Sequence, residues 1–252
     1  MSGPGLVRLW LLPECCADAF AAGLGGTRLL TDAERARMLR LRGGGARRRY
    51  LAARLLSRYA LSAYTGRPLD RWRFRPGPFG RPEPEPAGDG VRFNLSHTAG
   101  LVVCVVAPDG RACGVDVERT PFSPDAARHL VRHFAAAERA ELEGLGPGSR
   151  AARTGELWVL KEAYLKALGT GVTRSLDGFS FRTAAGGRVV VEDRERPADE
   201  GSRWWFDLLR PAPGYVLAVA AEGGSPADLH RTDLSTHDPD IPHSEGRLSH
   251  VC

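Results

Sequence analysis

The chain has 252 residues, 42% hydrophobic and 26% charged, which is enough to bury a sizeable core and excludes a wholly disordered chain. No apolar run approaches the roughly 20 residues that cross a bilayer, which excludes a transmembrane helix. The net charge is +5, but residues 1–80 hold fifteen arginines against five acidic residues, so an anionic partner (phosphate, nucleic acid or an acidic protein) is favoured, unless the excess only reflects general use of Arg.

The first part of the chain is expected to mix strands and helices. The run 6–12 is short and lacks a basic lead-in, so it predicts a first strand rather than a signal peptide. The further expected elements are helices at 31–41 and 46–64, broken at 43–45, then a short strand at 72–74, a Pro- and Gly-rich loop at 76–90, and strands at 91–95, 101–106 and 112–118. Asp109-Gly110 predicts a hairpin turn between the last two strands.

The second part continues this mixed order, which is typical of the α+β class. Helices are expected at 124–134, 135–145 and 150–168, and strands at 178–182, 188–192, 204–209 and 215–221. From residue 223 the periodicity vanishes, and four of the seven histidines lie there. This region is expected to be a disordered tail, with a metal-binding tail as the alternative.

Cysteine and lysine usage are both informative. The five cysteines include no C-x-x-C pair and are odd in number, which favours free thiols in a reducing, cytoplasmic compartment. Only two of the 35 basic residues are lysines, Lys161 and Lys166. In a chain that otherwise uses arginine, these two positions indicate a specific requirement.

Two segments bring carboxylates together. In the strand 112–118, alternate residues share a face, so Asp116 and Glu118 point the same way, opposite to Val115 and Val117. Such a pair repels unless a cation or a proton intervenes, although a solvated strand edge would also explain it.

On the helix 150–168, Glu162 and Lys166 are neighbours at i and i+4, with Trp158 one turn earlier. A surface salt bridge is the simpler interpretation, but a compact ammonium also suits a phosphate site.

A third segment ends the strand 91–95 with Ser96 and His97. Adjacent residues project to opposite sides of an extended chain, and no G-x-S-x-G elbow is present, so a hydrolase triad is not indicated. Donors for an oxyanion are the better interpretation. No Walker A or dinucleotide-binding glycine motif follows a strand in the required way.

Taken in order, F-N-x-S-H at 93–97, G-V-D-x-E at 114–118 and W-x-x-K-E-A-x-x-K-x-x-G-x-G at 158–171 closely resemble the 4′-phosphopantetheinyl transferases of the larger, surfactin-synthetase-activating (Sfp-like) type. The similarity covers roughly residues 1–222. It implies a pseudo-dimer of two similar α+β halves, 1–111 and 112–222, with the active site in the cleft between them and 223–252 as a tail.

The resemblance also implies a reaction. The 4′-phosphopantetheine arm of coenzyme A would move to a serine of an apo acyl or peptidyl carrier protein, an acidic partner, with release of adenosine 3′,5′-bisphosphate. It implies a cytoplasmic monomer, often tied to secondary metabolism, with neither nucleic acid nor membrane as a partner.

Site roles follow from the same resemblance. Mg²⁺, with Mn²⁺ as an alternative, would be held by Asp116, Glu118 and Glu162, and Glu162 would also act as the base. Lys166 would contact the phosphate. The coenzyme would further be bound by Ser96 and His97 at the pyrophosphate, Arg81 at the nucleotide phosphates and Arg37 at the 3′-phosphate, with Arg35 and Arg49 as competitors for that last role. Val117 stands where some relatives carry a third acid, and Glu34 where a second cation is expected.

Two other classes of function compete. A basic nucleic-acid-binding module would use Arg47, Arg48 and Arg49 with Trp72, Trp204 or Trp205 as stacking aromatics, but it leaves the three carboxylates unexplained. A metal-dependent phosphohydrolase explains the carboxylates but not the basic N-terminal part.

Overall fold

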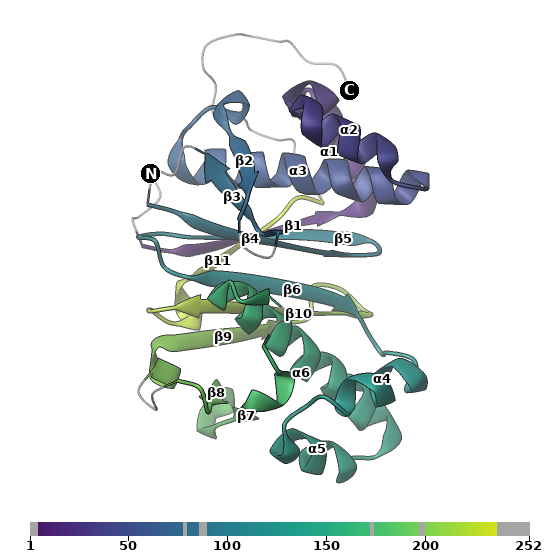
Figure 1. Ribbon diagram of the computed structural model, residues 1–252, viewed down its shortest axis with the longest axis vertical. Coiled ribbons are helices and arrows are strands. Elements are labelled where there is room, and N and C mark those ends of the chain that lie inside the picture. The colour runs from purple at the N-terminus through teal and green to yellow at the C-terminus, as the bar shows by residue number, and fades with distance from the viewer. Residues whose placement is uncertain (1–4, 78–79, 86–89, 172–173, 197–199, 236–252) are drawn as a thin grey trace.

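The computed structural model describes the chain except residues 1–4, 78–79, 86–89, 172–173, 197–199 and 236–252. Two sheets lie face to face in the middle of the molecule, and each has helices on its outer side (Figure 1). The larger sheet has the strand order β11-β1-β5-β4 and the smaller one β6-β10-β9. None of the described helices is both long and apolar enough to span a membrane.

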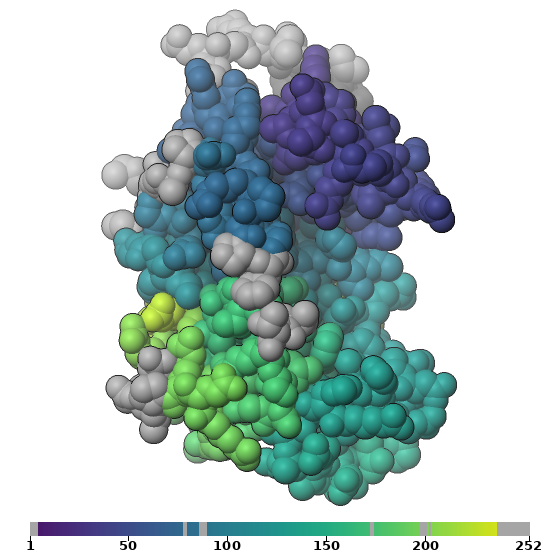
Figure 2. Space-filling view, in the orientation of Figure 1, coloured from purple at the N-terminus to yellow at the C-terminus, as the bar shows by residue number. Residues whose placement is uncertain are grey.

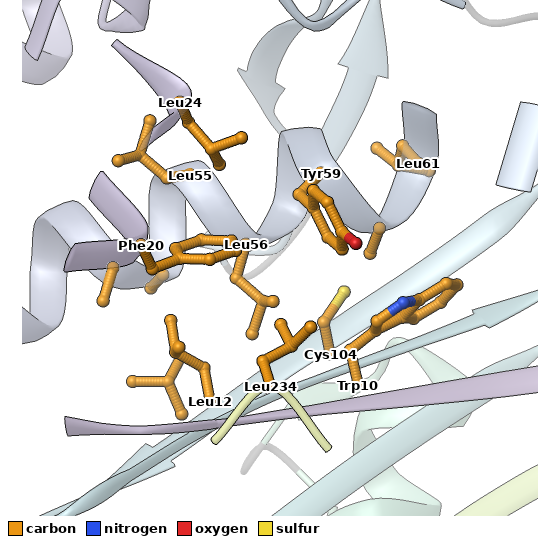
Figure 3. Packing of buried hydrophobic residues seen from close by; sticks show 14 of the residues in the cluster. Trp10, Leu12, Phe20, Leu24, Leu55, Leu56, Tyr59, Leu61, Cys104 and Leu234 are labelled. Carbon is orange, nitrogen blue, oxygen red and sulfur yellow. The ribbon is translucent and has the colours of Figure 1, made fainter. Parts of the chain in front are cut away.

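The first half is built on the larger sheet. Its strands are β1 (Val7–Pro13), β4 (Arg92–Thr98), β5 (Leu101–Ala107) and β11 (Leu229–Asp233), and its helices are α1 (Ala17–Leu24), α2 (Asp32–Arg40) and α3 (Gly44–Thr65). A small hairpin of β2 (Arg73–Pro76) and β3 (Pro82–Glu85) flanks them. The apolar face of α3 packs on this sheet, with Leu56 and Tyr59 above Trp10 and Leu12 (Figure 3).

The second half follows the same plan of a sheet with a long helix on its outer face. Its elements are β6 (Cys113–Arg119), β9 (Trp204–Leu209), β10 (Tyr215–Glu222), a hairpin of β7 (Phe179–Thr183) and β8 (Val189–Asp193), and the helices α4 (Pro124–Val131), α5 (Ala136–Glu143) and α6 (Pro147–Leu168). Leu160, Ala163 and Tyr164 of α6 face this sheet and are fully buried. In Figure 2 this half forms the green lower part of the molecule.

A third apolar layer joins the halves. Alternate residues of β1 and β5, such as Leu9 and Val105, meet Val115 and Val117 of β6 between the two sheets. Both faces of β6 are therefore covered: its odd positions from 113 to 117 contact the first half and its even positions from 114 to 118 turn toward α6 and the edge of β4.

Most expected elements are present, and the α+β class is confirmed. Three expectations were wrong. The loop at 76–90 contains β3, whose prolines mask a strand that pairs with β2. Asp109 and Gly110 both adopt positive φ, as a hairpin turn requires, but they link β5 to β6 across the two sheets, because β5 pairs with β4 and β1 instead. In addition, the structure contains helix α1, which no expectation covered.

The third correction concerns the tail. Residues 229–233 form β11, which pairs in parallel with β1, and Leu234 is buried in the first core with 4% of its surface exposed. The chain therefore returns to the first half after completing the second one, and residues 229–234 are ordered parts of that half; residues 236–252 lie outside the described part of the chain. The histidines at 237, 243 and 250 lie outside the described residues.

Candidate functional site

The site lies where β4 and β6, each an edge strand of its own sheet, run next to one another. They are joined by side chains from one face of β4. Asn94 Oδ1 accepts a hydrogen bond from the backbone N–H of Val115 at 3.1 Å, and Thr98 Oγ1 donates to Glu118 Oε2 at 3.2 Å. Ser96 lies between them. Period-two spacing thus places three polar side chains of β4 along the line where β4 and β6 run side by side, which we call the seam.

Helix α6 approaches β6 unusually closely at Gly114. A Cβ atom at this position would lie 2.0 Å from the carbonyl oxygen of Ala163 and 2.5 Å from the backbone nitrogen of Ala167. Only glycine permits this distance. Because Glu162 and Lys166 each precede one of these two contact residues, the close approach brings both side chains to the seam.

Asp116 and Lys166 form the centre of the site. Lys166 Nζ lies 2.5 Å from Asp116 Oδ1 and 3.2 Å from Ser96 Oγ, and Ser96 Oγ donates to the same carboxylate oxygen at 2.8 Å. Only 4% of the Asp116 surface is exposed. Its second oxygen, Oδ2, is buried and has no hydrogen-bond partner in the described part of the chain. A buried, unpartnered carboxylate oxygen is a ready ligand for a hard cation.

The two other carboxylates lie around the same pocket. Burial, followed by repulsion from Asp116, raises the pKa of both Glu118 and Glu162 above the usual value of a glutamate. The pocket has a volume of about 310 Å³; we call it the seam pocket, and it is lined by Leu95, Ser96, His97, Asp116, Glu118, Trp158, Glu162 and Lys166. The acidic strand and the acidic helix therefore line one pocket, as the resemblance implied.

These carboxylates could hold a divalent cation, since their oxygens suit Mg²⁺. Among the described residues, however, no group of three or more His, Cys, Asp or Glu side chains already has the spacing of a closed metal site. The ammonium of Lys166 currently neutralises the central oxygen of Asp116. The donor set fits the cation through the unpartnered Asp116 Oδ2 and two neighbouring glutamates whose repulsion by Asp116 a cation would relieve, rather than through a preformed cage.

His97 lies on the other face of β4 from Ser96, as the alternation of the strand predicts, and its ring is exposed at the pocket. Partial burial, with smaller effects of Arg49 and Lys166, lowers the pKa of this imidazole. This shift favours the neutral imidazole, which offers one donor and one acceptor.

Arg81 has a structural role that the sequence did not indicate. Its guanidinium donates to the carbonyl oxygens of Lys166 at 2.9 Å, Phe93 at 2.9 Å and Cys113 at 3.4 Å. It thereby caps the last turn of α6 and joins that helix to β4 and β6. The side chain also lines a second pocket of about 320 Å³, the Arg81 pocket, together with Glu162, Lys166 and the glycines that follow α6. A phosphate contact of Arg81 stays a prediction.

The candidates for the 3′-phosphate differ in their surroundings. Arg37 is exposed on α2 and lines neither pocket. Arg35 is held by Asp32 and by carbonyls of the preceding turn. Arg49 binds Glu14 at 3.1 Å and acts electrostatically on His97, so it has the most direct link to the seam pocket.

Glu34, which stands where a second cation was expected, is explained by the fold. Its carboxylate closes the capping box of α2 by accepting from the N–H of Thr31 at 2.9 Å. It also pairs with the fully buried Arg58 at 2.7 Å. This position is therefore occupied by a structural acid.

Lys161 is structural too, and its surroundings supply the specific requirement that the rarity of lysine indicated. It is fully buried, and its Nζ lies 2.8 Å from Glu138 Oε2, 2.7 Å from the oxygen of Leu176 and 2.8 Å from that of Phe179. Three acceptors match the three N–H donors of an ammonium, a geometry that a planar guanidinium cannot satisfy. Lys166 alone faces the pocket.

The residues missed from the sequence are Asn94, Thr98 and Gly114. The first two could have been found from their period-two spacing with Ser96. The stacking aromatics of a nucleic-acid-binding module are not available: Trp72 and Trp205 are buried, and Trp204 packs on Tyr164 with ring centroids 5.2 Å apart.

Comparison with known proteins bears on the same segments. The model of the 4′-phosphopantetheinyl transferase superfamily matches residues 112–220, which include β6 and α6. The 4′-phosphopantetheinyl transferase HetI of Nostoc sp. is 31% identical over 219 residues, 86% of this chain and 88% of HetI. The 4′-phosphopantetheinyl transferase Sfp of Bacillus subtilis is 32% identical over 141 residues, 55% of this chain and 59% of Sfp.

Other matches are partial. A second 4′-phosphopantetheinyl transferase of Bacillus subtilis is 33% identical over 46% of its length, so the chain spans about half the length of these two Bacillus relatives. The solved holo-[acyl-carrier-protein] synthase of Thermotoga maritima has a TM-score of 0.36 and 19% identity over 44% of this chain and 62% of its own. The match to HetI extends along most of both chains, and this chain belongs to the 4′-phosphopantetheinyl transferase superfamily.

Proposed function

We propose that the protein transfers the 4′-phosphopantetheine arm of coenzyme A to a serine hydroxyl of an apo carrier protein and releases adenosine 3′,5′-bisphosphate. The observation that carries this proposal is the seam pocket, which is lined by three carboxylates and one lysine from β6 and α6. One of these carboxylates, Asp116, has a buried oxygen, Oδ2, without a hydrogen-bond partner in the described part of the chain. Membership of the superfamily and the printed activity of its relatives support it.

We further propose that the reaction depends on Mg²⁺, with Mn²⁺ as a substitute, held by Asp116, Glu118 and Glu162. The cation would neutralise the crowded carboxylates and polarise the pyrophosphate. Lys166, 2.5 Å from Asp116, would stabilise charge on the transferred and leaving phosphates. Ser96 and His97 would add hydrogen-bond donors for the pyrophosphate.

Glu162 is the proposed base. Its raised pKa lies closer to neutral pH than that of an ordinary glutamate, which strengthens it as a proton acceptor. The proton of the carrier serine would pass to the Glu162 carboxylate as the serine oxygen forms its bond to phosphorus and the bond to the leaving bisphosphate breaks.

The proposed partner is an acidic acyl or peptidyl carrier protein, often one of secondary metabolism. The exposed arginines of α2, the following turn and the start of α3 support an acidic partner; they are Arg37, Arg40, Arg42, Arg47 and Arg48. We also propose a monomer, because one chain supplies both edges of the seam. The four described cysteines are unpaired, which suits a reducing cytoplasm.

The decisive experiment is mass spectrometry of a panel of apo carriers incubated with coenzyme A and Mg²⁺. We expect a phosphopantetheine mass gain on at least one carrier and none with Glu162→Gln. Glu156→Gln is the matched control, because Glu156 lies on the same helix but pairs with Arg153 and Arg210 outside the pocket. Normal transfer by Glu162→Gln would reject the assignment.

Two further measurements separate the steps. Asp116→Ala should weaken coenzyme binding in the presence of Mg²⁺ much more than in its absence, as measured by titration calorimetry. Incubation with coenzyme A but no carrier should leave the coenzyme intact. Release of adenosine 3′,5′-bisphosphate without a carrier would instead indicate a metal-dependent phosphohydrolase.

A further inference from the structure

Two adjacent cysteines, Cys15 and Cys16, lie in the short 3₁₀ turn that follows β1, outside the pockets described above. Their Sγ atoms are 3.7 Å apart, and Cys16 Sγ also contacts the carbonyl oxygen of Ser235 at 3.8 Å. Cys15 is exposed and Cys16 is half-buried, so reagents in solution can reach the pair. Burial and the neighbouring Cys15 thiol raise the pKa of Cys16, which keeps its proton on at neutral pH.

The spacing of the two sulfurs discriminates between possible products. A disulfide needs sulfurs about 2.05 Å apart, so these would have to move together by more than 1 Å within one dipeptide. One soft atom bound to both sulfurs by bonds of about 2.3 Å, at the pyramidal angle near 90° of a trivalent centre, keeps them roughly 3.3 Å apart. The observed 3.7 Å is much nearer to this second case than to the first. One soft atom can therefore bridge the two thiols after a small movement, whereas a disulfide needs a large one.

The surroundings limit how many further ligands this chain supplies. Glu14, the nearest carboxylate in sequence, is held by Arg49 at 3.1 Å and by the N–H of Gly100 at 2.9 Å. No third His, Cys, Asp or Glu side chain completes a metal-holding group within the described ranges. The pair thus suits a thiophilic centre that needs two protein ligands and brings its remaining ligand with it.

We propose that Cys15 and Cys16 form a dithiol site for monosubstituted trivalent arsenicals. With phenylarsine oxide, two As–S bonds form while both S–H bonds and the As=O bond break. The oxide oxygen leaves as water with the two thiol protons, and arsenic stays trivalent. Because a broken As–S bond re-forms while the other still holds the arsenic, the adduct resists displacement by monothiols but not by dithiols.

The test is native and intact mass spectrometry of the full chain with one equivalent of phenylarsine oxide in excess monothiol, without coenzyme or carrier. We expect one phenylarsenic group per chain, removed by a 1,2-dithiol. Cys15→Ser and Cys16→Ser should each retain the adduct roughly a hundredfold less well, because one thiolate loses the chelate effect.

Two full-length variants serve as controls. Cys104→Ala removes a fully buried thiol, and Cys252→Ser removes the cysteine outside the described residues; both should keep the adduct. Absence of an adduct in the unmodified chain, its persistence in either single serine variant, or its loss in Cys252→Ser would overturn the proposal. None of these outcomes depends on the transferase activity.

Discussion

Replacing Lys161 by methionine should destabilise the protein strongly although the residue lies outside the seam pocket. The ammonium is fully buried and bonds to Glu138, whose side chain is only 1% exposed, and to two backbone carbonyls. Methionine fills a similar volume but leaves the carboxylate buried without its counter-charge. Breaking a buried ion pair by removing one partner costs about 3–5 kcal/mol. For a domain of this size that is a fall in Tm of roughly 6–20 °C.

Glu138 holds more than the single ion pair with Lys161. Glu138 also accepts from the backbone N–H groups of Ala135 at 3.0 Å and Phe181 at 2.9 Å. Replacing both members of a simple buried pair by apolar residues is often neutral. Here the double variant Glu138→Met with Lys161→Met would leave four backbone groups without partners, so it should stay destabilised. Lys161→Arg should cost about 1–3 kcal/mol through overpacking.

Urea denaturation followed by circular dichroism measures these differences as shifts in the midpoint at constant m. The matched control is Arg182→Met, which removes the cation of an exposed pair with Glu192, where the two side chains are 58% and 60% exposed; it should cost less than about 0.5 kcal/mol. If Lys161→Met lay within about 1 kcal/mol of the parent chain at unchanged m, the ammonium would not be holding these elements together and the reasoning would fail.

Three further predictions rest on single positions. Gly114→Ala should lower transfer by roughly a hundredfold, because a Cβ 2.0 Å from the Ala163 oxygen displaces α6 by a large fraction of an ångström. The control is Gly148→Ala, which lies on the same helix with open space around it. It should leave transfer unchanged and be neutral or slightly stabilising for the fold. Leu234→Ala should cost about 2–5 kcal/mol in urea denaturation, and Leu39→Ala, which is 61% exposed, less than about 0.5 kcal/mol; equal costs would contradict the role of the returning C-terminal segment. Folding raises the pKa of Glu162, so ionisation of this carboxyl opposes folding once the pH exceeds the unfolded pKa of about 4.5. Glu162→Gln should therefore raise the free energy of unfolding more at pH 8 than at pH 4. If the difference in unfolding free energy between the variant and the parent chain did not depend on pH, the pKa of Glu162 would not be raised by folding.

The sequence predicted the strand and the helix that carry the site residues better than it predicted the contact between them. Period two in the strand of Asp116 and Glu118, and the i, i+4 relation of Glu162 and Lys166, each follow from local geometry and were confirmed. That α6 lies against β6 depends on Gly114, whose role is visible only when the opposing backbone is present. Burial of Lys161 was equally hidden, because rarity of lysine signals a requirement without saying which one.

The missed elements share a weak apolar pattern. Strand β11 (Leu229–Asp233) begins with a leucine and continues with four polar residues, because it is the outer strand of its sheet and buries mainly the Leu234 that follows it. Its partner β1 is more than two hundred residues away in sequence, so no local turn announces the pairing. Helix α1 buries alanines besides Phe20 and Leu24, which gives too few large side chains for a clear period.

The position of the site follows from a problem that the two-sheet fold must solve. An edge strand leaves backbone N–H groups without a ladder partner, and β4 and β6 meet edge to edge inside the molecule, where water cannot satisfy them. Asn94 and Ser96 accept from the N–H groups of Val115 and Val117 instead. Polar side chains are therefore required at this seam for folding alone. Ser96 also donates to Asp116. The side chains that satisfy the edge strands therefore also hold in place the carboxylate that the proposed chemistry needs, and the contacts that stabilise the fold orient the site.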